Sequence, residues 1–320
     1  MFPSSCISEA AGTDSFRCMC GWFFRWAQRA IVLLAACLAW PGSPLAAPAI
    51  TVLLSEPAGI HQVTAASLLQ SLSREGWTIT VSTPETYVKT DANLTVAVGT
   101  RALEFALAQP GRPVLSLLVP WLTHERLSAG QRQVSALYLD QPLTRQLQLL
   151  ELALPDLKQV GVPLGTLSQG MQSTLANASK DSGLPVGTAL IQRGTDWYAA
   201  LTTLSENSQA FLLLPDPMVT QRGVLQTFFL HTYRLKKPVL AYSAPLVQSG
   251  ALLGLYATPA QLGEEAAGWI KESWTKGGFR LGASRYPKRF TIGVNRSVAR
   301  SLDIALPSEA SLTRQLEAMP

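Results

Sequence analysis

The sequence has 320 residues, of which 47% are hydrophobic and 15% charged, and its formal net charge is +5. A chain of this length can bury one large or two medium cores, and it has no basic block interleaved with aromatic residues, which argues against a nucleic-acid partner. All four cysteines lie in the first 37 residues, so disulfides and thiolate metal sites are excluded from the rest of the chain. The three histidines are far apart in sequence, so no metal site is predicted. No cofactor is expected either.

Residues 1–47 have the pattern of a secretory signal peptide. Arginines precede an apolar run over residues 30–40, and prolines and small residues follow it up to Ala47. The run is too short to span a membrane, so we expect export and a periplasmic protein. The sequence Leu34-Ala35-Ala36-Cys37 also matches a bacterial lipobox, which leaves open a membrane-anchored lipoprotein with a lipid on Cys37.

Strand and helix patterns alternate through the first part of the mature chain. Apolar runs predict strands at residues 50–54, 78–82, 94–98 and 113–119. Helical spacing predicts helices at residues 63–74 and 102–108. Short connections between alternating strands and helices imply a parallel sheet covered on both faces.

A longer helix, beginning after Asp140 and ending at Pro155, is expected to join this region to a second one. Leu143, Leu147, Leu150 and Leu154 fall at helical spacing within it. The Asp140 side chain is placed to cap its first turn. We therefore expect one α/β lobe to end and a second one to begin at this helix.

The second region repeats the same plan. Its strands are predicted at residues 159–162, 186–191, 210–214 and 238–242, and its helices at 169–182, 196–205 and 220–233. The last third predicts a helix at 259–276, a strand at 290–294 and a short helix at 297–301. These pieces are too small for a third domain, and we interpret them as the chain crossing back to the first lobe and returning to the second.

Several segments, in this order, carry a resemblance to a known family. They are Val98-Gly99-Thr100, residues 150–156 before Val160-Gly161-Val162, Leu214-Pro215-Asp216, Pro238-Val239 leading to residues 249–252, Gly263 with Ala266-Ala267, and residues 294–307. The chain resembles the ABC-transporter substrate-binding proteins of the type I periplasmic fold, in the branch that includes tryptophan and tyrosine binders.

The resemblance implies two doubly wound α/β lobes with parallel sheets, joined by a hinge of several crossings. We expect residues 48–138 and 253–282 to form lobe 1, and residues 139–252 and 283–320 to form lobe 2. The family binds a small molecule in the cleft between its lobes and delivers it to an ABC permease. The expected function is therefore solute capture, with contact to the membrane only through the permease or a lipid on Cys37.

Residues that follow buried strands are the candidate ligand contacts, because ligands of parallel sheets bind outside the carboxyl ends of the strands. Thr100 and Arg101 open a helix directly after a strand, which suits a carboxylate or phosphate. Thr100 could equally be a helix cap that touches no ligand. Asp216 follows another strand between two prolines, where it could pair with a ligand amine or cap the next helix.

Three further candidates lie in the predicted second lobe. Tyr242 and Ser243 follow the next strand, and Tyr242 could stack on an aromatic or apolar ligand or be a core tyrosine. Ser168 lies in the segment Gly165-Thr166-Leu167-Ser168, where the family usually has an Asn-Ser pair. A second departure is Val119-Pro120-Trp121, where the family usually has Asp-Pro. The altered cleft keeps open an alternative function as an envelope sensor or adaptor.

An enzyme is the least favoured class. The sequence has no Gly-x-Ser-x-Gly elbow, no phosphate-cradling glycine loop, no zinc-ligand spacing and no cysteine in the mature chain that could act as a nucleophile. Solute binding and adaptor function therefore remain the two hypotheses to compare with the structure.

Overall fold

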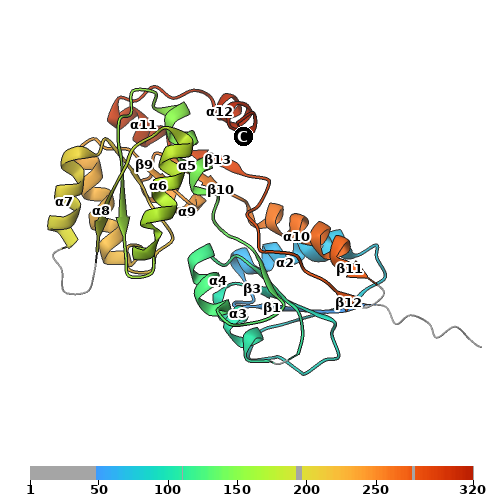
Figure 1. The fold of residues 1–320 in the computed structure, drawn as a ribbon. Coiled ribbons are helices and arrows are strands. Elements are labelled where there is room, and N and C mark those ends of the chain that lie inside the picture. The colour runs from blue at the N-terminus through green and yellow to red at the C-terminus, as the bar shows by residue number, and fades with distance from the viewer. Residues whose placement is uncertain (1–47, 110, 192–196, 276–277, 320) are drawn as a thin grey trace, which may run out of the picture. The chain divides into compact units, whose positions relative to one another are not determined.

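The structure is a computed structural model that describes residues 48–109, 111–191, 197–275 and 278–319. The predicted signal peptide, the lipobox and all four cysteines lie outside these residues, as does the predicted start of a helix at Asp196. Two sheets, each with helices on both faces, organise the described chain (Figure 1). The predicted α/β class with two doubly wound lobes is confirmed.

The first sheet is entirely parallel and has the order β2-β1-β3-β4-β5. Its strands are β1 (Ala49–Leu54), β2 (Thr78–Ser82), β3 (Leu94–Val98), β4 (Val114–Leu117) and β5 (Val134–Leu137). The strand order reverses between β1 and β3, so the crevice at their carboxyl ends is the usual ligand position of such a sheet.

Two pairs of helices cover the first sheet. They are α2 (Gly59–Leu72) with α10 (Pro259–Ser273) on one face, and α3 (Thr100–Leu107) with α4 (Trp121–Ser128) on the other. The helices α2 and α10 cross closely at Gly263, where any side chain would overlap the carbonyl oxygen of Thr64. A small hairpin, β11 (Trp274–Thr275) and β12 (Gly278–Phe279), packs its aromatic rings on Trp77.

The second sheet has the order β13-β10-β9-β8-β6-β7. Its strands are β6 (Val160–Leu164), β7 (Val186–Leu190), β8 (Ala210–Leu212), β9 (Val239–Ala241), β10 (Leu253–Tyr256) and β13 (Thr291–Val294). All neighbours are parallel except β13, which pairs antiparallel with β10. The boundary predicted at residue 253 is displaced, because β10 belongs to this sheet and the chain leaves it only after Tyr256.

Helices also cover both faces of the second sheet. One face carries α5 (Leu143–Ala153), the 3-10 turn η1 (Gln169–Met171), α6 (Gln172–Ser182), α11 (Arg296–Leu302) and α12 (Glu309–Glu317). The other carries α7 (Trp197–Asn207), α8 (Arg222–Arg234) and α9 (Ala244–Ser249). The helix α6 ends at Gly183, whose φ of 77° gives the left-handed cap expected there.

The chain passes between the two sheets three times, at residues 138–142, 257–258 and 286–290. The last crossing begins later than the predicted boundary at residue 283, because Arg285 pairs with the edge strand β5. Its backbone N–H donates to Ala136 O (2.8 Å), and Tyr138 N–H donates to Arg285 O (3.0 Å).

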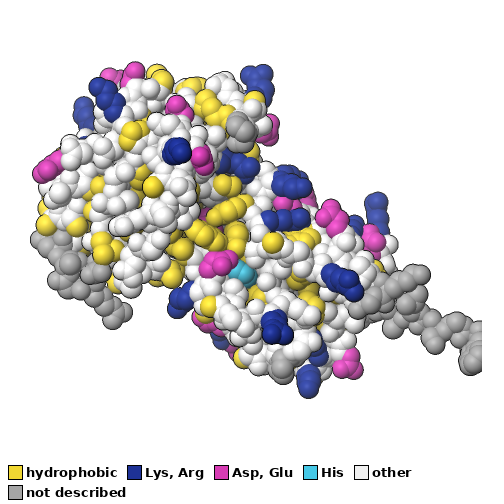
Figure 2. Space-filling model, viewed as in Figure 1, with side chains coloured by type: hydrophobic (Ala, Val, Ile, Leu, Met, Phe, Trp, Pro, Cys, Tyr) yellow, Lys and Arg dark blue, Asp and Glu magenta, His cyan; other side chains and the backbone are white. Residues whose placement is uncertain are grey.

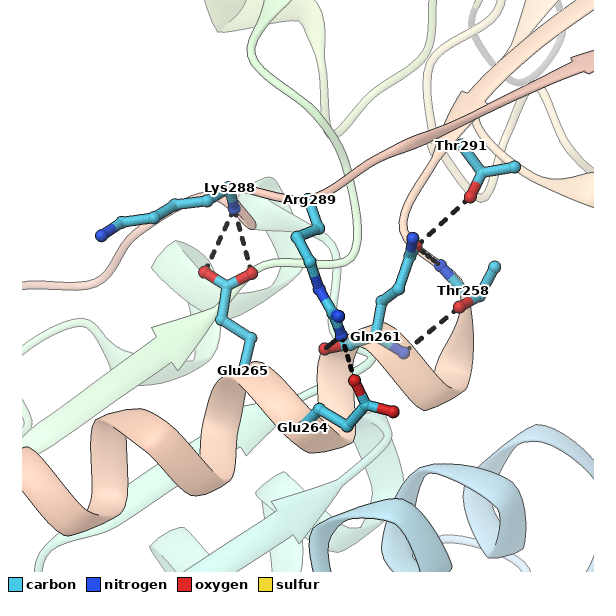
Figure 3. A network of polar contacts seen from close by, with 7 residues as sticks. All are labelled: Thr258, Gln261, Glu264, Glu265, Lys288, Arg289 and Thr291. Atoms are coloured by element: carbon cyan, nitrogen blue, oxygen red, sulfur yellow. Dashed lines mark hydrogen bonds and ion pairs between the residues drawn. The ribbon is translucent and has the colours of Figure 1, made fainter. Parts of the chain in front are cut away.

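Polar contacts at the start of α10 tie the second crossing to the third (Figure 3). The network consists of Thr258, Gln261, Glu264, Glu265, Lys288, Arg289 and Thr291. Thr258 and Gln261 form a reciprocal capping box, and Thr291 Oγ1 donates to Gln261 Oε1 at 3.3 Å. Arg289 pairs with Glu264 at 2.6 Å, so this part of the hinge is held by charge as well as by backbone.

Candidate functional site

The crevice between β1 and β3 contains the N-terminus of α3. Gly99 is its N-cap residue, and Ser55 Oγ accepts a hydrogen bond from Ala102 N–H at 2.9 Å. A Cβ on Gly99, whose φ is 94°, would lie 2.5 Å from Ser55 Oγ and 2.6 Å from His61 Nε2, so the close approach requires glycine. Thr100 is therefore the first helical residue and is half-buried, but it is not the cap.

Ser55 and His61 are members of this crevice that sequence reasoning missed. The signal for Ser55 was its place directly after the buried strand β1. Burial lowers the pKa of His61, and the carboxylate of Glu56 partly offsets this effect. The N-terminus of α3 is half-buried here, and its backbone N–H groups are of the kind that can bind an anionic group.

Arg101 was predicted to contact the ligand, but in the structure it contacts Glu85. Its guanidinium forms an ion pair with Glu85, and both side chains are more than half exposed. The structure therefore places Arg101 at the surface of the first lobe, engaged with an acidic side chain of the same lobe.

Asp216 and Ser168, predicted separately, meet in one buried cluster. Asp216 Oδ2 accepts from both the backbone N–H and the hydroxyl of Ser168, each at 2.7 Å, and Oδ1 accepts from Met218 N–H at 2.8 Å. Both residues are 0% exposed. The expectation that flanking prolines leave the carboxylate without local donors is wrong, because the donors come from Met218 and from a loop 48 residues earlier in sequence.

Two consequences follow for Asp216. Its carboxylate accepts three hydrogen bonds from neutral donors within its own lobe, and its pairing with a ligand amine stays a prediction. It is not the cap of the next helix either, since α8 begins at Arg222 and the carboxylate bonds within the loop before it. Gly165, whose N–H donates to Ser168 Oγ at 2.9 Å, lies so close that a Cβ there would overlap the carboxylate.

Tyr242 and Ser243 lie at the carboxyl end of β9, as predicted. Tyr242 is half-buried against the core beneath α8, and burial raises the pKa of its hydroxyl while a hydrogen bond with Thr220 lowers it. Ser243 is the N-cap residue of α9, but its side chain makes no capping hydrogen bond. The structure thus supports the core interpretation of the Tyr242 ring, with the side chain only partly buried.

Asp140, which was expected to cap the helix that follows it, lies at the carboxyl end of β5. Asp140 does not cap α5, whose N-cap residue is Pro142; instead its Oδ1 accepts from Trp121 N–H, the first residue of α4, at 2.8 Å. Asp140 is 7% exposed. Burial raises the pKa of its carboxyl from near 3.8 to about 6, although hydrogen bonds from Trp121 and its own N–H oppose the shift.

Two tyrosines lie close enough to this carboxylate to feel its charge. The ring centroids of Tyr138 and Tyr286 are 5.0 Å apart, and Tyr138 Oη donates to Glu125 Oε1 at 2.8 Å. Burial raises the pKa of both phenols, and the charges of Asp140 and Glu125 add to the effect. The third crossing of the chain supplies Tyr286, so the cluster joins residues that are far apart in sequence.

Two of the cavities in the described part of the chain are of similar volume, and one of them opens at the carboxyl ends of β1 and β2. One, of about 530 Å³, is mainly apolar and is lined by residues of α2 and of the segment after β2, including Leu54, Ala66 and Val81. The other, of about 560 Å³, is lined by residues of α8 and by Thr220 and Ser249. Among the described residues no group of three potential metal ligands occurs, and no helix there is long and apolar enough to cross a membrane. Basic side chains are dispersed over the face shown in Figure 2 and alternate with acidic ones.

Comparison with known proteins gives one family and many structural neighbours. The family model described as "ABC transporter substrate binding protein" matches residues 67–314. No curated protein matches the sequence. A Streptococcus pneumoniae ABC domain in complex with L-Trp aligns with a TM-score of 0.58 and 17% identity, covering 84% of this chain and 98% of that chain.

Two further structures show the same fold. The ligand-free, open structure of a substrate-binding protein with adhesive properties from Clostridium difficile aligns with a TM-score of 0.60 and 19% identity, covering 81% of this chain and 95% of that one. A conserved domain protein from Vibrio cholerae aligns with a TM-score of 0.57 and 18% identity, covering 84% and 97%. These likenesses establish the fold.

Proposed function

Because the chain belongs to the family of ABC transporter substrate-binding proteins, we propose that it captures a small amino-acid-like or other polar or aromatic solute for an ABC importer. The observation that carries the proposal is the match of the family model over residues 67–314, which spans both sheets. Small-molecule sites of such folds lie between lobes, at the ends of parallel strands.

In this proposal the two lobes contribute different groups to ligand binding. The crevice of Ser55, Gly99 and Thr100 offers backbone N–H groups at the start of α3 to an anionic ligand group. Tyr242, at the end of β9, would contribute a partly buried aromatic ring from the second lobe. Closure about the three crossings would enclose the solute and exclude water, and opening at a permease would release it. No step in this cycle requires catalysis or a cofactor.

We further propose that the protein works in the periplasm, exported by the predicted signal peptide, with a lipid anchor at Cys37 as the alternative. Its protein partner would be the permease, which would recognise the closed state. The dispersed surface charge gives no reason to add a nucleic acid to these partners (Figure 2).

A second candidate function has one observation in its favour. Two predicted ligand contacts, Ser168 and Asp216, are bonded to each other and buried, and a third, Arg101, is paired with Glu85. A cleft whose polar groups are already paired suits a sensor or adaptor that contacts an envelope protein without transporting a solute.

Thermal unfolding in the presence of a solute library separates the two functions. A ligand at a hundredfold excess over its dissociation constant adds about 2.7 kcal/mol to the free energy of unfolding, which raises the melting temperature measurably. L-Tryptophan is the first probe, since a structural neighbour was crystallised with it. Solution scattering of the same mixtures should show compaction. A library that yields neither a thermal shift nor compaction contradicts solute capture and favours the adaptor.

A further inference from the structure

A small polar cavity lies against α5, on the face of the second sheet that also carries α12. Its volume is about 230 Å³, and its lining comes from α5, from the third crossing and from the end of α12. None of the candidate ligand contacts described above lines it, so it is separate from the proposed solute site. Pockets for drug-sized ligands measure about 300–1,000 Å³, so this one suits a smaller molecule.

Gln148 is the first sign that the cavity has a ligand. Its side chain lines the cavity and is only 8% exposed, yet no residue in the described part of the chain forms a hydrogen bond with it. The neighbouring Gln146 is satisfied differently, since its Nε2 donates to Gln141 O at 2.7 Å. Because a buried amide without a hydrogen bond is unfavourable, the Gln148 amide needs a partner from the cavity.

Arg145 is a half-buried cation that lines the same cavity. Its Nη1 donates to two neutral acceptors, Gln141 Oε1 at 2.6 Å and Pro287 O at 3.3 Å. Nε and Nη2 have no acceptor among the described residues, and none of the ion pairs there includes Arg145. Burial lowers the pKa of Arg145, although the charge of Glu265 opposes this, and an arginine stays protonated at neutral pH. The Arg145 guanidinium therefore has donors left for an anion.

The Phe290 ring holds this guanidinium in place, since the central carbon of Arg145 lies 5.2 Å from the ring centroid. Phe290 also lines the cavity and packs against the core of the second sheet. The position of the charge is therefore set by the fold before any ligand arrives.

A second cation and a helix N-terminus border the same cavity. Lys288 donates its backbone N–H to Glu265 at 3.1 Å, but its ammonium group points away from that carboxylate (Figure 3). Thr144 lies in the first turn of α5, whose N-cap residue, Pro142, gives no side-chain cap. The first N–H groups of a helix lack partners within it and favour an anion. Glu317, which is exposed, is the one acidic side chain among the described lining residues.

We propose that this cavity binds a small oxyanion, a phosphate or a short dicarboxylate, through Arg145, Lys288 and Gln148 and the N-terminus of α5. A guanidinium matches the paired oxygens of either group, and the Gln148 amide offers it two further N–H donors. Because Lys288 belongs to the third crossing and Arg145 to α5, a bound anion would join this crossing to the second lobe. The site goes beyond solute capture and does not depend on it.

Calorimetric titration with inorganic phosphate and with malonate tests the site, in a chloride buffer of constant ionic strength without other oxyanions. Lys288→Gln removes one charge and leaves the backbone bond to Glu265 in place. Gln148→Leu removes the amide at similar volume, and Arg145→Gln removes the guanidinium. Arg314→Gln is the matched control, because Arg314 is an exposed arginine of α12 that does not line the cavity.

We expect wild type to bind at least one of the two anions at a single site of this kind. Its affinity should fall at least about tenfold in Arg145→Gln and Lys288→Gln and about fivefold in Gln148→Leu, and change less than about twofold in Arg314→Gln. Glu317→Gln should strengthen binding, because it removes a negative charge from the lining. Whichever anion binds with this pattern identifies the class of ligand.

Two results would overturn the inference. One is that neither anion binds to wild type, and the other is that Lys288→Gln and Gln148→Leu bind as wild type does, which would place the anion elsewhere. These two variants decide the matter if Arg145→Gln fails to fold. Either result leaves solute capture standing, since that function is tested with the solute library and not with these anions.

Discussion

Asp140 and Asp216 are two buried carboxylates at the ends of buried parallel strands, and they differ in their donors. Asp216 accepts from the Ser168 N–H, the Ser168 hydroxyl and the Met218 N–H, all between 2.7 and 2.8 Å. Asp140 has backbone N–H groups alone, and its pKa is raised to about 6. A place at a strand end therefore does not by itself define a binding residue. What matters is whether the protein itself already supplies the partners of the charge.

The largest expected effect is on stability, at Asp216. Asp216→Ala removes the acceptor for three buried donors, and hydrogen bonds to charged groups are worth about 1.5–3 kcal/mol each. We expect a loss of about 3–5 kcal/mol in the free energy of unfolding, measured by urea denaturation. Asp156→Ala, at the surface, should change it by less than about 0.5 kcal/mol. An unchanged urea midpoint for Asp216→Ala would support Asp216 as a free ligand contact.

Asp140→Asn should have the opposite effect on the ligand-free protein. Folding raises the pKa of Asp140 from near 3.8 to about 6, so the folded state holds the proton more tightly than the unfolded chain. Stability is therefore fully present below pH 4 and is lost as the pH rises to about 6, by about 2–3 kcal/mol.

Asp140→Asn has no titrating carboxyl at this position, so it does not lose stability in this way as the pH rises. Its melting temperature at pH 7 should exceed that of wild type, and the difference between the two should shrink as the pH is lowered to 4. Calorimetric scans of both proteins from pH 4 to 7.5 measure this. A variant that is less stable than wild type at pH 7 would show that the Asp140 charge is compensated within the fold.

Gly165 tests how tightly the Asp216 cluster is packed. A Cβ at Gly165 would overlap the Asp216 carboxylate, while a Cβ at Gly170, a few residues later in η1, would meet no atom within 4 Å. Gly165→Ala should therefore cost about 1–3 kcal/mol of stability, the usual range for overpacking, and Gly170→Ala should not destabilise. Equal effects of the two substitutions in urea denaturation would mean that the cluster yields to the added methyl group.

Long periodic patterns and buried apolar runs could be predicted from the sequence, and short polar elements could not. The buried strand at residues 94–98 and the end of α6 at Gly183 agree with the structure. The helix α4, with the sequence WLTHERLS, the four-residue strand β5 and the helices α9 and α12 were missed. Such segments owe their structure to packing on a sheet that already exists, rather than to their own periodicity.

In the candidate site, likewise, the strand ends could be predicted from the sequence and the hydrogen-bond partners could not. Apolar runs end visibly in the sequence, so Thr100, Asp216 and Tyr242 could be placed at strand ends. Their partners could not be predicted, because Ser168 reaches Asp216 across 48 residues and Ser55 reaches Ala102 across 47. Asp140 was assigned to the helix that follows it, because a local cap is the simplest interpretation of an aspartate before a proline. Instead, Asp140 accepts a hydrogen bond from the backbone N–H of Trp121, which precedes it in the sequence.

The smallest expected effect on stability is at Arg101, a charged residue that lies at the surface rather than in the interior. Its side chain is 59% exposed and that of its partner Glu85 is 52% exposed, so water screens the pair. A double-mutant cycle of Arg101→Gln and Glu85→Gln should give a coupling below about 1 kcal/mol in the free energy of unfolding. Binding of indole-3-propionate should change less than twofold in either variant, because the anionic group is expected at the start of α3 rather than at Arg101. A tenfold loss in Arg101→Gln alone would show that the guanidinium leaves Glu85 for the ligand, and Arg101 would then belong to the site after all.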